Sequence, residues 1–204
     1  MENPANQITI RGSLLELPQL SHTNHGSPFY RFSLEVPRLS GALDILPVIV
    51  REDILCRLDL SGGEMLTVQG QIRSFNNHSP TGRRLQIFVF AERLTAESGE
   101  PCNQVSVSGT VCKLPVYRRT PLGREITDVM LAVSRSYRRA DYLPCILWGR
   151  TAQEAAQCVL GDTLCIQGRL QSRDYRKITE TGTEIRTTYE ISALTAQIGA
   201  ITEA

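Results

Sequence analysis

The sequence contains little of what marks membrane, secreted and metal-binding proteins. No apolar run approaches the roughly 18 residues that a membrane-spanning helix needs. The opening residues MENPANQITIRG lack the basic flank and long apolar stretch of a signal peptide. The six cysteines form no C-x-x-C pair, which favours buried thiols over disulfides or metal ligands. We therefore expect a folded protein of the cytoplasm that does not contact a membrane.

Motifs for catalysis are also missing. The three histidines, His22, His25 and His78, lie in polar segments of the first half, and no cysteine or carboxylate cluster completes a metal site around them. No glycine-rich phosphate-binding loop follows a strand and opens a helix, and no Ser, His and Asp set forms a recognisable motif. We expect no enzyme activity, no metal and no cofactor.

The chain does have enough apolar residues for a core, and its charge is uneven. With 204 residues and 41% hydrophobic side chains, it can form one large or two ordinary domains. Residues 1–102 hold 9 arginines, no lysine and 11 acids, for a net charge of −2, whereas residues 103–204 hold 11 arginines, 2 lysines and 10 acids, for +3. A polyanionic partner is therefore more compatible with the second half.

The sequence contains an internal repeat of about a hundred residues. Residues that match at a spacing of 97 include Asn6 with Asn103, Gly12 with Gly109, Leu34 with Leu131, and Asp44 with Asp141. After one extra residue the spacing becomes 98, which pairs Gly63 and Gly70 with Gly161 and Gly168. We interpret this register as two homologous domains, residues 5–94 and 103–196, joined by the small and polar linker Thr95–Cys102.

Each repeat has the pattern of five strands, since its apolar runs are short, β-branched or alternating. The strands predicted in the first repeat are Gln7–Leu15, Phe29–Val36, Leu46–Arg51, Met65–Ser74 and Leu85–Ala91. Those in the second are Gln104–Lys113, Ile126–Ser134, Leu143–Trp148, Thr163–Ser172 and Thr187–Leu194. One helix candidate, Glu52–Leu58 or Ala152–Val159, lies between the third and fourth strands of each repeat.

This order is that of the OB-fold, a partly open barrel whose loops after strands one and four flank a nucleic-acid-binding face. We therefore predict an all-β protein of two tandem five-stranded OB-fold barrels, each with one short helix between strands 3 and 4. The predicted first loops are Ser21–Pro28 and Arg118–Gly123, and the predicted fourth loops are Asn76–Arg83 and Asp174–Arg186, with Gly182 at a turn.

Aromatic and arginine side chains are mixed in the stretch from Leu131 to Tyr175. Bases of a single strand stack on flat side chains, worth roughly 1–3 kcal/mol each, while guanidinium groups contact the phosphates. The stretch is therefore typical of a surface that binds single-stranded nucleic acid.

The second repeat resembles the bacterial single-stranded DNA-binding protein family. The motifs that carry the resemblance are Asn103-Gln-Val, Gly109, Leu131-Ala-Val133, Trp148-Gly149-Arg with Ala152, Leu160-Gly161-Asp, Gln167-Gly168-Arg169-Leu170 and Tyr189-Glu-Ile191. They occur in family order over most of residues 103–194. The resemblance implies single-stranded DNA binding without strong sequence preference, in DNA replication, recombination or repair.

The family stacks bases at four places, and the resemblance transfers these to aromatic residues of this chain: Tyr137, Tyr142, Trp148 and Tyr175. A tyrosine in a strand can equally be half-buried packing, and Trp148 can plug the barrel. The basic residues expected to contact phosphates are Arg118, Arg119, Arg135, Arg138, Arg139, Arg150, Arg169, Arg173 and Lys177, with Arg124 and Arg176 beside them.

The first repeat lacks these aromatics. Its equivalent positions hold Ser40, Ile45, Val50 or Arg51, and Asn77. Its remaining aromatic side chains lie in apolar runs and are expected in the core: Phe29, Tyr30, Phe32, Phe75, Phe88 and Phe90. We therefore expect a degenerate binding face, weak nucleic-acid binding and a mainly packing or oligomerising role for the first domain.

The resemblance also concerns partners. Family members act as four OB-folds, so two folds per chain imply a homodimer, and replication or repair proteins are possible partners. The family's glycine-rich tail with an acidic tip is not matched by the last residues, Gln197–Ala204, so any recruitment is expected to use another surface. The alternative is a primosome-like OB-fold adaptor that binds proteins and only weakly binds nucleic acid.

Overall fold

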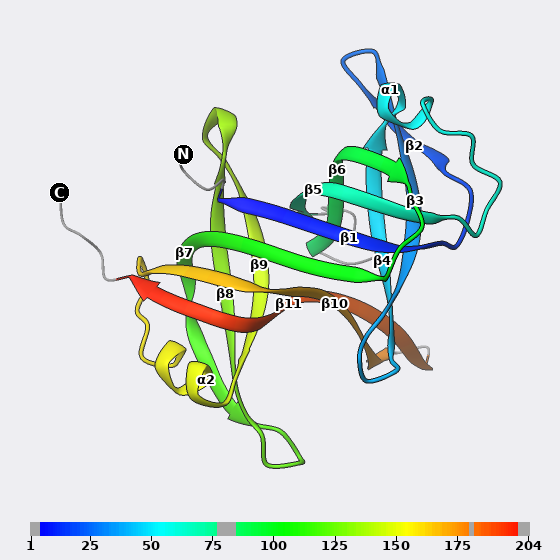
Figure 1. The fold of residues 1–204 in the computed structure, drawn as a ribbon. Coiled ribbons are helices and arrows are strands. Elements are labelled where there is room, and N and C mark those ends of the chain that lie inside the picture. Colours follow the sequence, from blue (N-terminus) through cyan, green and yellow to red (C-terminus); the bar gives the residue numbers. More distant parts are fainter. Residues whose placement is uncertain (1–4, 77–84, 180–181, 200–204) are drawn as a thin grey trace.

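The computed structural model describes residues 5–76, 85–179 and 182–199, apart from the side chains of residues 177–179, and these residues are almost all in β-strands (Figure 1). The elements of the first half are β1 Asn6–Leu14, β2 Gln19–Asn24, β3 Ser27–Pro37, β4 Leu43–Arg51, α1 Glu52–Leu55, β5 Met65–Asn76 and β6 Leu85–Ala96. Those of the second half are β7 Cys102–Arg119, β8 Glu125–Arg135, η1 Ser136–Arg138, β9 Arg139–Trp148, α2 Gly149–Ala155, β10 Thr163–Thr179 and β11 Gly182–Gly199.

Strand pairing closes each half into a ring of five strands. In the first half β1 pairs with β3 and β5, β3 with β4, β4 with β6 and β6 with β5. In the second half the same circuit runs through β7, β8, β9, β11 and β10. The pairings β4–β6 and β9–β11 are parallel, and the others are antiparallel. The prediction of an all-β protein with two tandem OB-fold barrels is confirmed.

Alternation along the strands gives each barrel its core. On β9, Leu143, Cys145 and Leu147 are buried, whereas the side chains between them are more exposed, apart from Ile146. Because successive side chains of a strand point to opposite faces, the buried set fills the barrel and the other set forms its outer surface. The first core is formed in the same way, with Phe32 and Leu34 of β3 almost fully buried.

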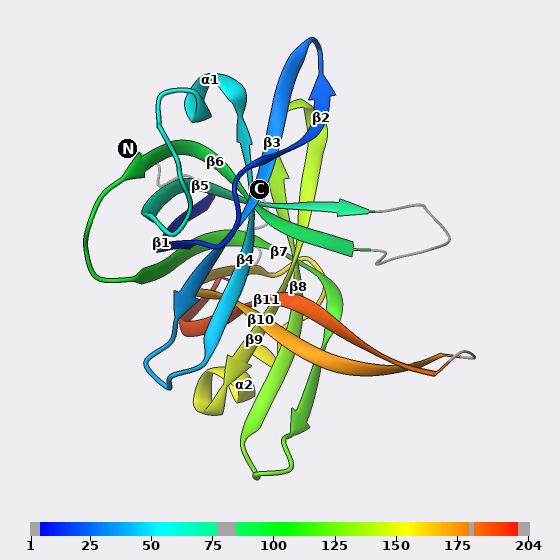
Figure 2. The same cartoon turned by 90° about the vertical axis from the view of Figure 1, so that its right-hand side faces the viewer.

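A pseudo-twofold axis relates the two barrels. Strands β1 and β7 pair antiparallel, and the residues opposite one another at the centre, Ile8 and Val105, are equivalent positions of the repeat. This pairing joins the strands of both halves into one eleven-stranded sheet. Figure 2 shows the barrels on either side of this junction, with β2 and α1 at one end and α2 at the other.

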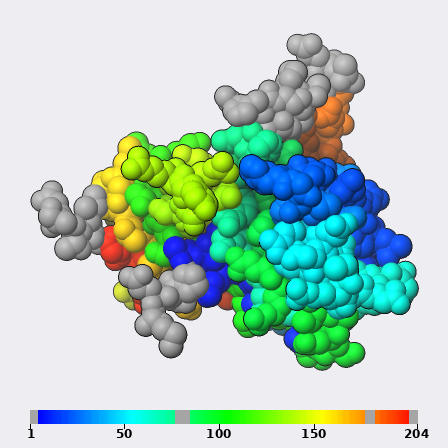
Figure 3. Space-filling view, turned by 90° about the horizontal axis from the view of Figure 1, so that it is seen from above, coloured from blue at the N-terminus to red at the C-terminus, as the bar shows by residue number. Residues whose placement is uncertain are grey.

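Two buried aspartates connect the barrels at equivalent places. Asp44 of β4 accepts a hydrogen bond of 2.7 Å from the backbone N–H of Ser172 on β10. Asp141 of β9 accepts one of 2.7 Å from Ser74 on β5. Arg38 and Arg135, again equivalent in the repeat, pair with these carboxylates. Figure 3 shows the β8–β9 hairpin, in yellow-green, against the teal strands of the first barrel.

The predicted element ends differ from the observed ones. Most of the predicted loop Asp174–Arg186 is strand, because β10 and β11 keep a continuous antiparallel register out to Thr179 and Gly182. Similarly, β2 (Gln19–Asn24) overlaps the first part of the predicted loop Ser21–Pro28 and pairs with β3. The helices end early, at Leu55 and Ala155, because tighter backbone bonds from Leu58 to Leu55 and from Cys158 to Ala155 replace further helical turns.

The six cysteines are free thiols. Cys145 and Cys158 are buried, and burial raises the pKa of both thiols. Within the described residues, no group of three or more His, Cys, Asp and Glu side chains is placed to hold a metal ion. Among the same residues, no helix has the length and apolar character needed to cross a membrane.

Candidate nucleic-acid interface

The candidate interface is the outer face of the second barrel. On β9 this face carries Tyr142, Pro144 and Trp148, which alternate with the buried core residues. Tyr142 and Trp148 lie six positions apart along the strand, or roughly 20 Å. The aromatic side chains therefore form a track along β9 and not a single cluster.

Trp148 lies at the last position of β9, opposite Ile126 on β8. Its ring is half-buried, and its Nε1–H donates a hydrogen bond of 3.1 Å to the hydroxyl of Ser192 on β11. This bond fixes the orientation of the indole. A Trp that is neither sealed in the core nor fully solvated can present part of its ring to a base.

The three tyrosines are exposed. Tyr142 is 42% exposed and Tyr175, on the extended part of β10, is 38% exposed. Tyr137 lies at the tip of the β8–β9 turn, where it is 94% exposed. Tyr137 and Arg138 both have positive φ, 60° and 55°, a conformation uncommon for residues other than glycine. The turn holds both side chains away from the barrel.

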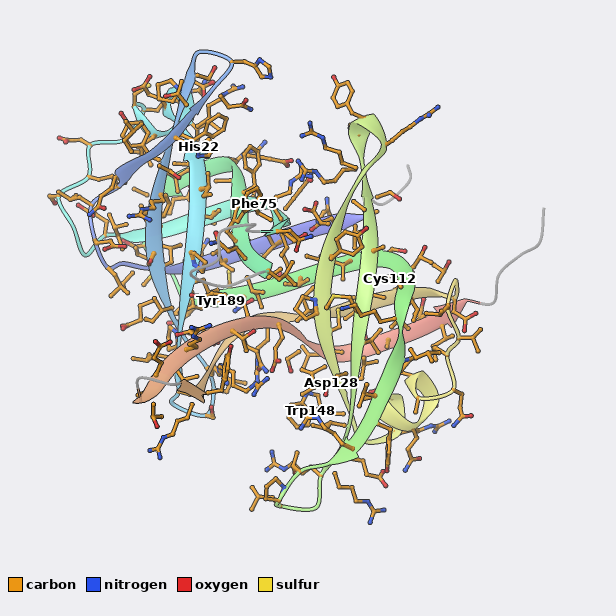
Figure 4. All side chains as sticks on the ribbon, turned by 180° about the vertical axis from the view of Figure 1, so that it is seen from behind. His22, Phe75, Cys112, Asp128, Trp148 and Tyr189 are labelled. Carbon is orange, nitrogen blue, oxygen red and sulfur yellow. The ribbon has the colours of Figure 1, made fainter. Side chains whose placement is uncertain are left out.

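A groove of about 680 Å³ surrounds Trp148. Arginines from three places line it: the first barrel, the β7–β8 hairpin and β10. These are Arg38, Arg118, Arg124, Arg169 and Arg173. In Figure 4, Trp148 is drawn at the lower end of the second barrel, near the β7–β8 turn. An indole beside several guanidinium groups is the combination that binds a base together with its neighbouring phosphates.

Most of the predicted arginines already have carboxylate partners. Their nitrogen-to-oxygen distances are 2.6 Å for Arg118–Asp128, 3.1 Å for Arg119–Glu125, 3.3 Å for Arg135–Asp141, 2.9 Å for Arg150–Glu154 and 3.4 Å for Arg173–Glu190. Hydrogen bonding to Asp128 raises the pKa of Arg118. These pairs hold the guanidinium groups in place, but a phosphate must compete with the carboxylates for them.

Glu190 is the buried carboxylate within this groove. It accepts a hydrogen bond of 2.9 Å from the amide of Gln171 and lies 3.4 Å from Arg173. Its charge also adds to the raised pKa of Arg38 and Arg118, whose first causes are their own partners Asp44 and Asp128. One carboxylate thus influences the arginines on both sides of the groove.

Arg169 differs from the paired arginines. Its nearest recorded acceptor is the Gln171 Oε1 at 3.5 Å, which is at the limit of a hydrogen bond. Its Nε is buried without a partner among the described residues. Because a buried N–H costs free energy until it finds an acceptor, Arg169 is prepared to receive an oxygen from a bound molecule.

The structure brings only some of the predicted residues together. Trp148, Arg118, Arg169 and Arg173 share the groove. Tyr137, Arg138 and Arg139 lie at the opposite end of β9, and Arg119 and Arg150 are exposed outside the groove lining. Lys177 lies on β10, and its side chain is outside the described residues.

Sequence reasoning missed several groove residues, among them Arg38, Ser40 and Glu190. Arg38 and Ser40 reach the groove from the β3–β4 turn of the first barrel, whose binding face was expected to be degenerate. The equivalence of Arg38 with Arg135 was a usable signal, because both follow the Leu-x-Val motif. Glu190 was visible only as part of the motif Tyr189-Glu-Ile191, and nothing in the sequence placed it beneath the arginines.

Comparisons with known proteins agree with this geometry. The model of the single-strand binding protein family matches residues 102–198. Single-stranded DNA-binding protein B of Bacillus subtilis (strain 168) is 39% identical over 80 residues, which cover 36% of this chain and 71% of that protein. The single-stranded DNA-binding protein of Deinococcus radiodurans is 24% identical over 205 residues, covering 83% of this chain and 68% of that protein.

A solved structure matches both halves together. The wild-type single-stranded DNA binding protein from Thermus aquaticus is similar with a TM-score of 0.80 and 22% identity, over 98% of this chain and 95% of that chain. At this identity the similarity shows the fold. The B. subtilis relative is similar enough, and covered far enough, to show the family. The chain therefore belongs to the single-strand binding protein family.

Proposed function

We propose that the protein binds single-stranded DNA without strong sequence preference, through the outer face of the second barrel. The observation that carries the proposal is the half-exposed Trp148 within a groove of five arginines. Ring faces and guanidinium groups contact the parts of a nucleotide that all four bases share, so such a site discriminates little between sequences.

The four aromatic residues and the groove arginines have distinct roles in this proposal. Trp148 stacks a base at one end of β9, Tyr142 stacks one further along, and Tyr137 and Tyr175 extend the track. The groove arginines neutralise phosphates, and Arg138 and Arg139, for which no ion pair is recorded among the described residues, contact the strand near Tyr137. The protein acts by binding and not by catalysis, which agrees with its family.

Binding to labelled oligonucleotides tests the proposal directly. We expect the full chain to bind a thymidine oligonucleotide much more tightly than a duplex of equal length, because duplex bases cannot stack on Trp148. Contacts to about five phosphates predict a slope of roughly −3.5 in a plot of log K against log salt. Equal affinity for duplex and single strand, or a slope near zero, would instead favour the adaptor function.

We also propose that two chains associate to give four barrels. The support is a hollow of about 620 Å³ on the pseudo-twofold axis, lined by the equivalent glutamines Gln7 with Gln104 and Gln69 with Gln167. A polar, self-complementary face of this kind suits a twofold interface. Light scattering should give about twice the chain mass, and a stable monomer would refute the dimer. We assign the protein to DNA replication, recombination or repair in the cytoplasm, where replication or repair proteins are its candidate partners.

A further inference from the structure

The first barrel carries aromatic rings on its outer face. The expectation that its phenylalanines fill the core holds for Phe32, which is 2% exposed. It is wrong for Phe75, which is 56% exposed, and for Phe29, Phe88 and Phe90, which are half-buried. These four residues alternate with the buried positions of β3, β5 and β6, so they face outward. They were misassigned because an apolar run can belong to either face of a strand.

Two of these rings, Phe29 and Phe90, form a row of ring contacts with His22, and a guanidinium lies at the end of the row. The ring of His22, on β2, lies 5.0 Å from the ring of Phe29 at an angle of 5°. Phe29 lies 6.1 Å from Phe90, tilted by 38°. The guanidinium carbon of Arg73 then lies 5.6 Å from the centre of the Phe90 ring. Aromatic rings and guanidinium groups are the side chains against which the bases of a single strand stack.

The row occupies the place that corresponds to the arginine groove of the second barrel. By the repeat register Phe29 takes the place of Ile126, and Arg51 that of Trp148. By strand pairing Phe90 takes the place of Ser192, the partner of the indole. The first barrel therefore keeps an aromatic surface on its binding face, but at other positions than those the family motifs mark.

Residues of the second barrel complete this surface. The backbone N–H of Tyr142 donates a hydrogen bond of 2.7 Å to the hydroxyl of Ser74, the neighbour of Phe75. Arg73 reaches across to Asp141 at 3.2 Å. Because Arg38 and Ser40 lean over the groove of the second barrel, the pseudo-twofold axis places their equivalents, Arg135 and Tyr137, beside the first. Figure 4 draws Phe75 between the barrels and His22 at the far end of the first.

We propose that this row, His22, Phe29, Phe90 and Arg73, together with the exposed Phe75, is a second binding surface for the same DNA strand. The inference rests on the proposed function, and it replaces the expectation of a mainly packing role for the first barrel. A strand that leaves Tyr137 and Tyr142 meets Phe75 next and continues over Phe90 toward His22. Arg31, exposed on the same face of β3 as Phe29, is positioned to contact its phosphates.

The test uses the full chain and two thymidine oligonucleotides. One has about 12 nucleotides, within the roughly 4–16 that a single OB-fold covers, and the other has about 30. The variant His22→Ala with Phe75→Ala removes two exposed side chains, so its fold should be retained. We expect its affinity for the longer strand to fall about tenfold. Its affinity for the shorter strand, measured on the second barrel, should stay within twofold of the wild type.

A control and a direct readout make the outcome decisive. Leu160→Ala, at a site 55% exposed on the second barrel and outside both surfaces, should leave both affinities unchanged. In the background Trp148→Phe, the indole introduced by Phe75→Trp should lose emission when the longer strand binds. Unchanged affinity of the double variant for the longer strand, or unquenched emission of that indole, would overturn the second surface. Failure of the wild type to bind either strand would refute the proposed function itself.

Discussion

At the scale of single residues, the arginines of the groove are restrained by carboxylates before any ligand arrives. Glu190 contacts Gln171 and Arg173 from a buried position, whereas Asp128 holds Arg118 from the rim. The exposed pair of Arg118 with Asp128 contributes little to the free energy of folding, about 0–1 kcal/mol. Such a pair orders the guanidinium group, but its carboxylate competes with phosphate for that group.

The variant Glu190→Gln should therefore bind single-stranded DNA more tightly. The amide can still accept from Gln171, while a negative charge next to the phosphate path is removed, worth about 1 kcal/mol or roughly fivefold in affinity. Fluorescence anisotropy at low salt measures the change. Glu154→Gln, which removes the partner of Arg150 outside the groove, is the matched control and should bind as the wild type does. Weaker binding by Glu190→Gln would contradict this account.

At this scale the sequence predicted which aromatic side chains are exposed, but it did not predict the ion pairs around the arginines. The aromatics Tyr137, Tyr142, Trp148 and Tyr175 are all at least partly exposed, as a stacking role requires. Local motifs indicate such positions because strand alternation fixes which face a residue occupies. The ion pairs could not be predicted, because Arg173 and Glu190 come from neighbouring strands 17 residues apart whose register is set by a bulge at Gly168.

At the scale of elements, short turns determine how strands enter the barrels. Between α1 and β5, the carboxylate of Glu64 accepts bonds from the backbone N–H groups of Ser61 and Gly62 and from the Ser61 hydroxyl. Gly62 and Gly63 have positive φ, 105° and 85°, which glycine adopts without strain. Hydrogen bonding from Ser61 lowers the pKa of Glu64 from 4.5 to about 2.

This shift predicts a pH dependence of stability. A carboxylate whose pKa is lower in the folded state stabilises the fold above its unfolded pKa, and that contribution is lost as the pH falls. Glu64→Gln should therefore unfold at lower urea than the wild type at neutral pH. The difference should shrink as the pH falls from 4.5 toward 2. A difference that is independent of pH, measured by urea unfolding across this range, would show that the turn does not depend on the ionised carboxylate.

The sequence predicted the barrel strands and their order, but neither the added strand β2 nor the ends of the elements. Five strands and one helix per repeat were predicted from hydrophobic periodicity. This periodicity arises because alternate side chains of a barrel strand are buried in the core. The outer parts of β7, β10 and β11 extend beyond the barrels, where no core imposes a period. Those strands are defined only by pairing across the hairpin, as between Tyr175 and Arg186. The hydrophobic pattern of the sequence does not indicate this pairing.

At the scale of the whole molecule, the two barrels are joined by equivalent contacts. The carboxylate of Asp44 is 1% exposed and bonds Arg38 and Ser172, and that of Asp141 is 0% exposed and bonds Arg135 and Ser74. A buried carboxylate requires all of its partners. The aspartates therefore favour one arrangement of the barrels, which keeps Arg38 in the groove of the second barrel.

Removing one of these charges should weaken the molecule as a unit. We expect Asp44→Asn to lower the free energy of unfolding by about 1–3 kcal/mol, because the amide loses the ion pair with Arg38 and part of its bonding to Ser172. Asp128→Asn, in an exposed pair with Arg118, should cost less than about 1 kcal/mol. Urea unfolding followed by circular dichroism compares them, and equal midpoints for the two variants would show that the buried link contributes nothing.

The repeat predicted two barrels but not how they are placed. Asp44 and Asp141 stood out as matching residues in the sequence, yet their partners Ser172 and Ser74 carry no signal of a contact between barrels. The same limit explains why the first barrel was expected to be degenerate. Its phenylalanines do not occupy the marked positions, and only the folded strands show that they lie on the outer face of the first barrel.

The emission of Trp148, the one tryptophan in the chain, tests the central claim most directly. When a thymidine oligonucleotide is added to the full-length protein at low salt, emission should be quenched to saturation and should recover as salt is raised, because stacking brings a base onto the ring and salt weakens the phosphate contacts. Emission that stays unchanged while the oligonucleotide binds would contradict the placement of the DNA on the second barrel's groove.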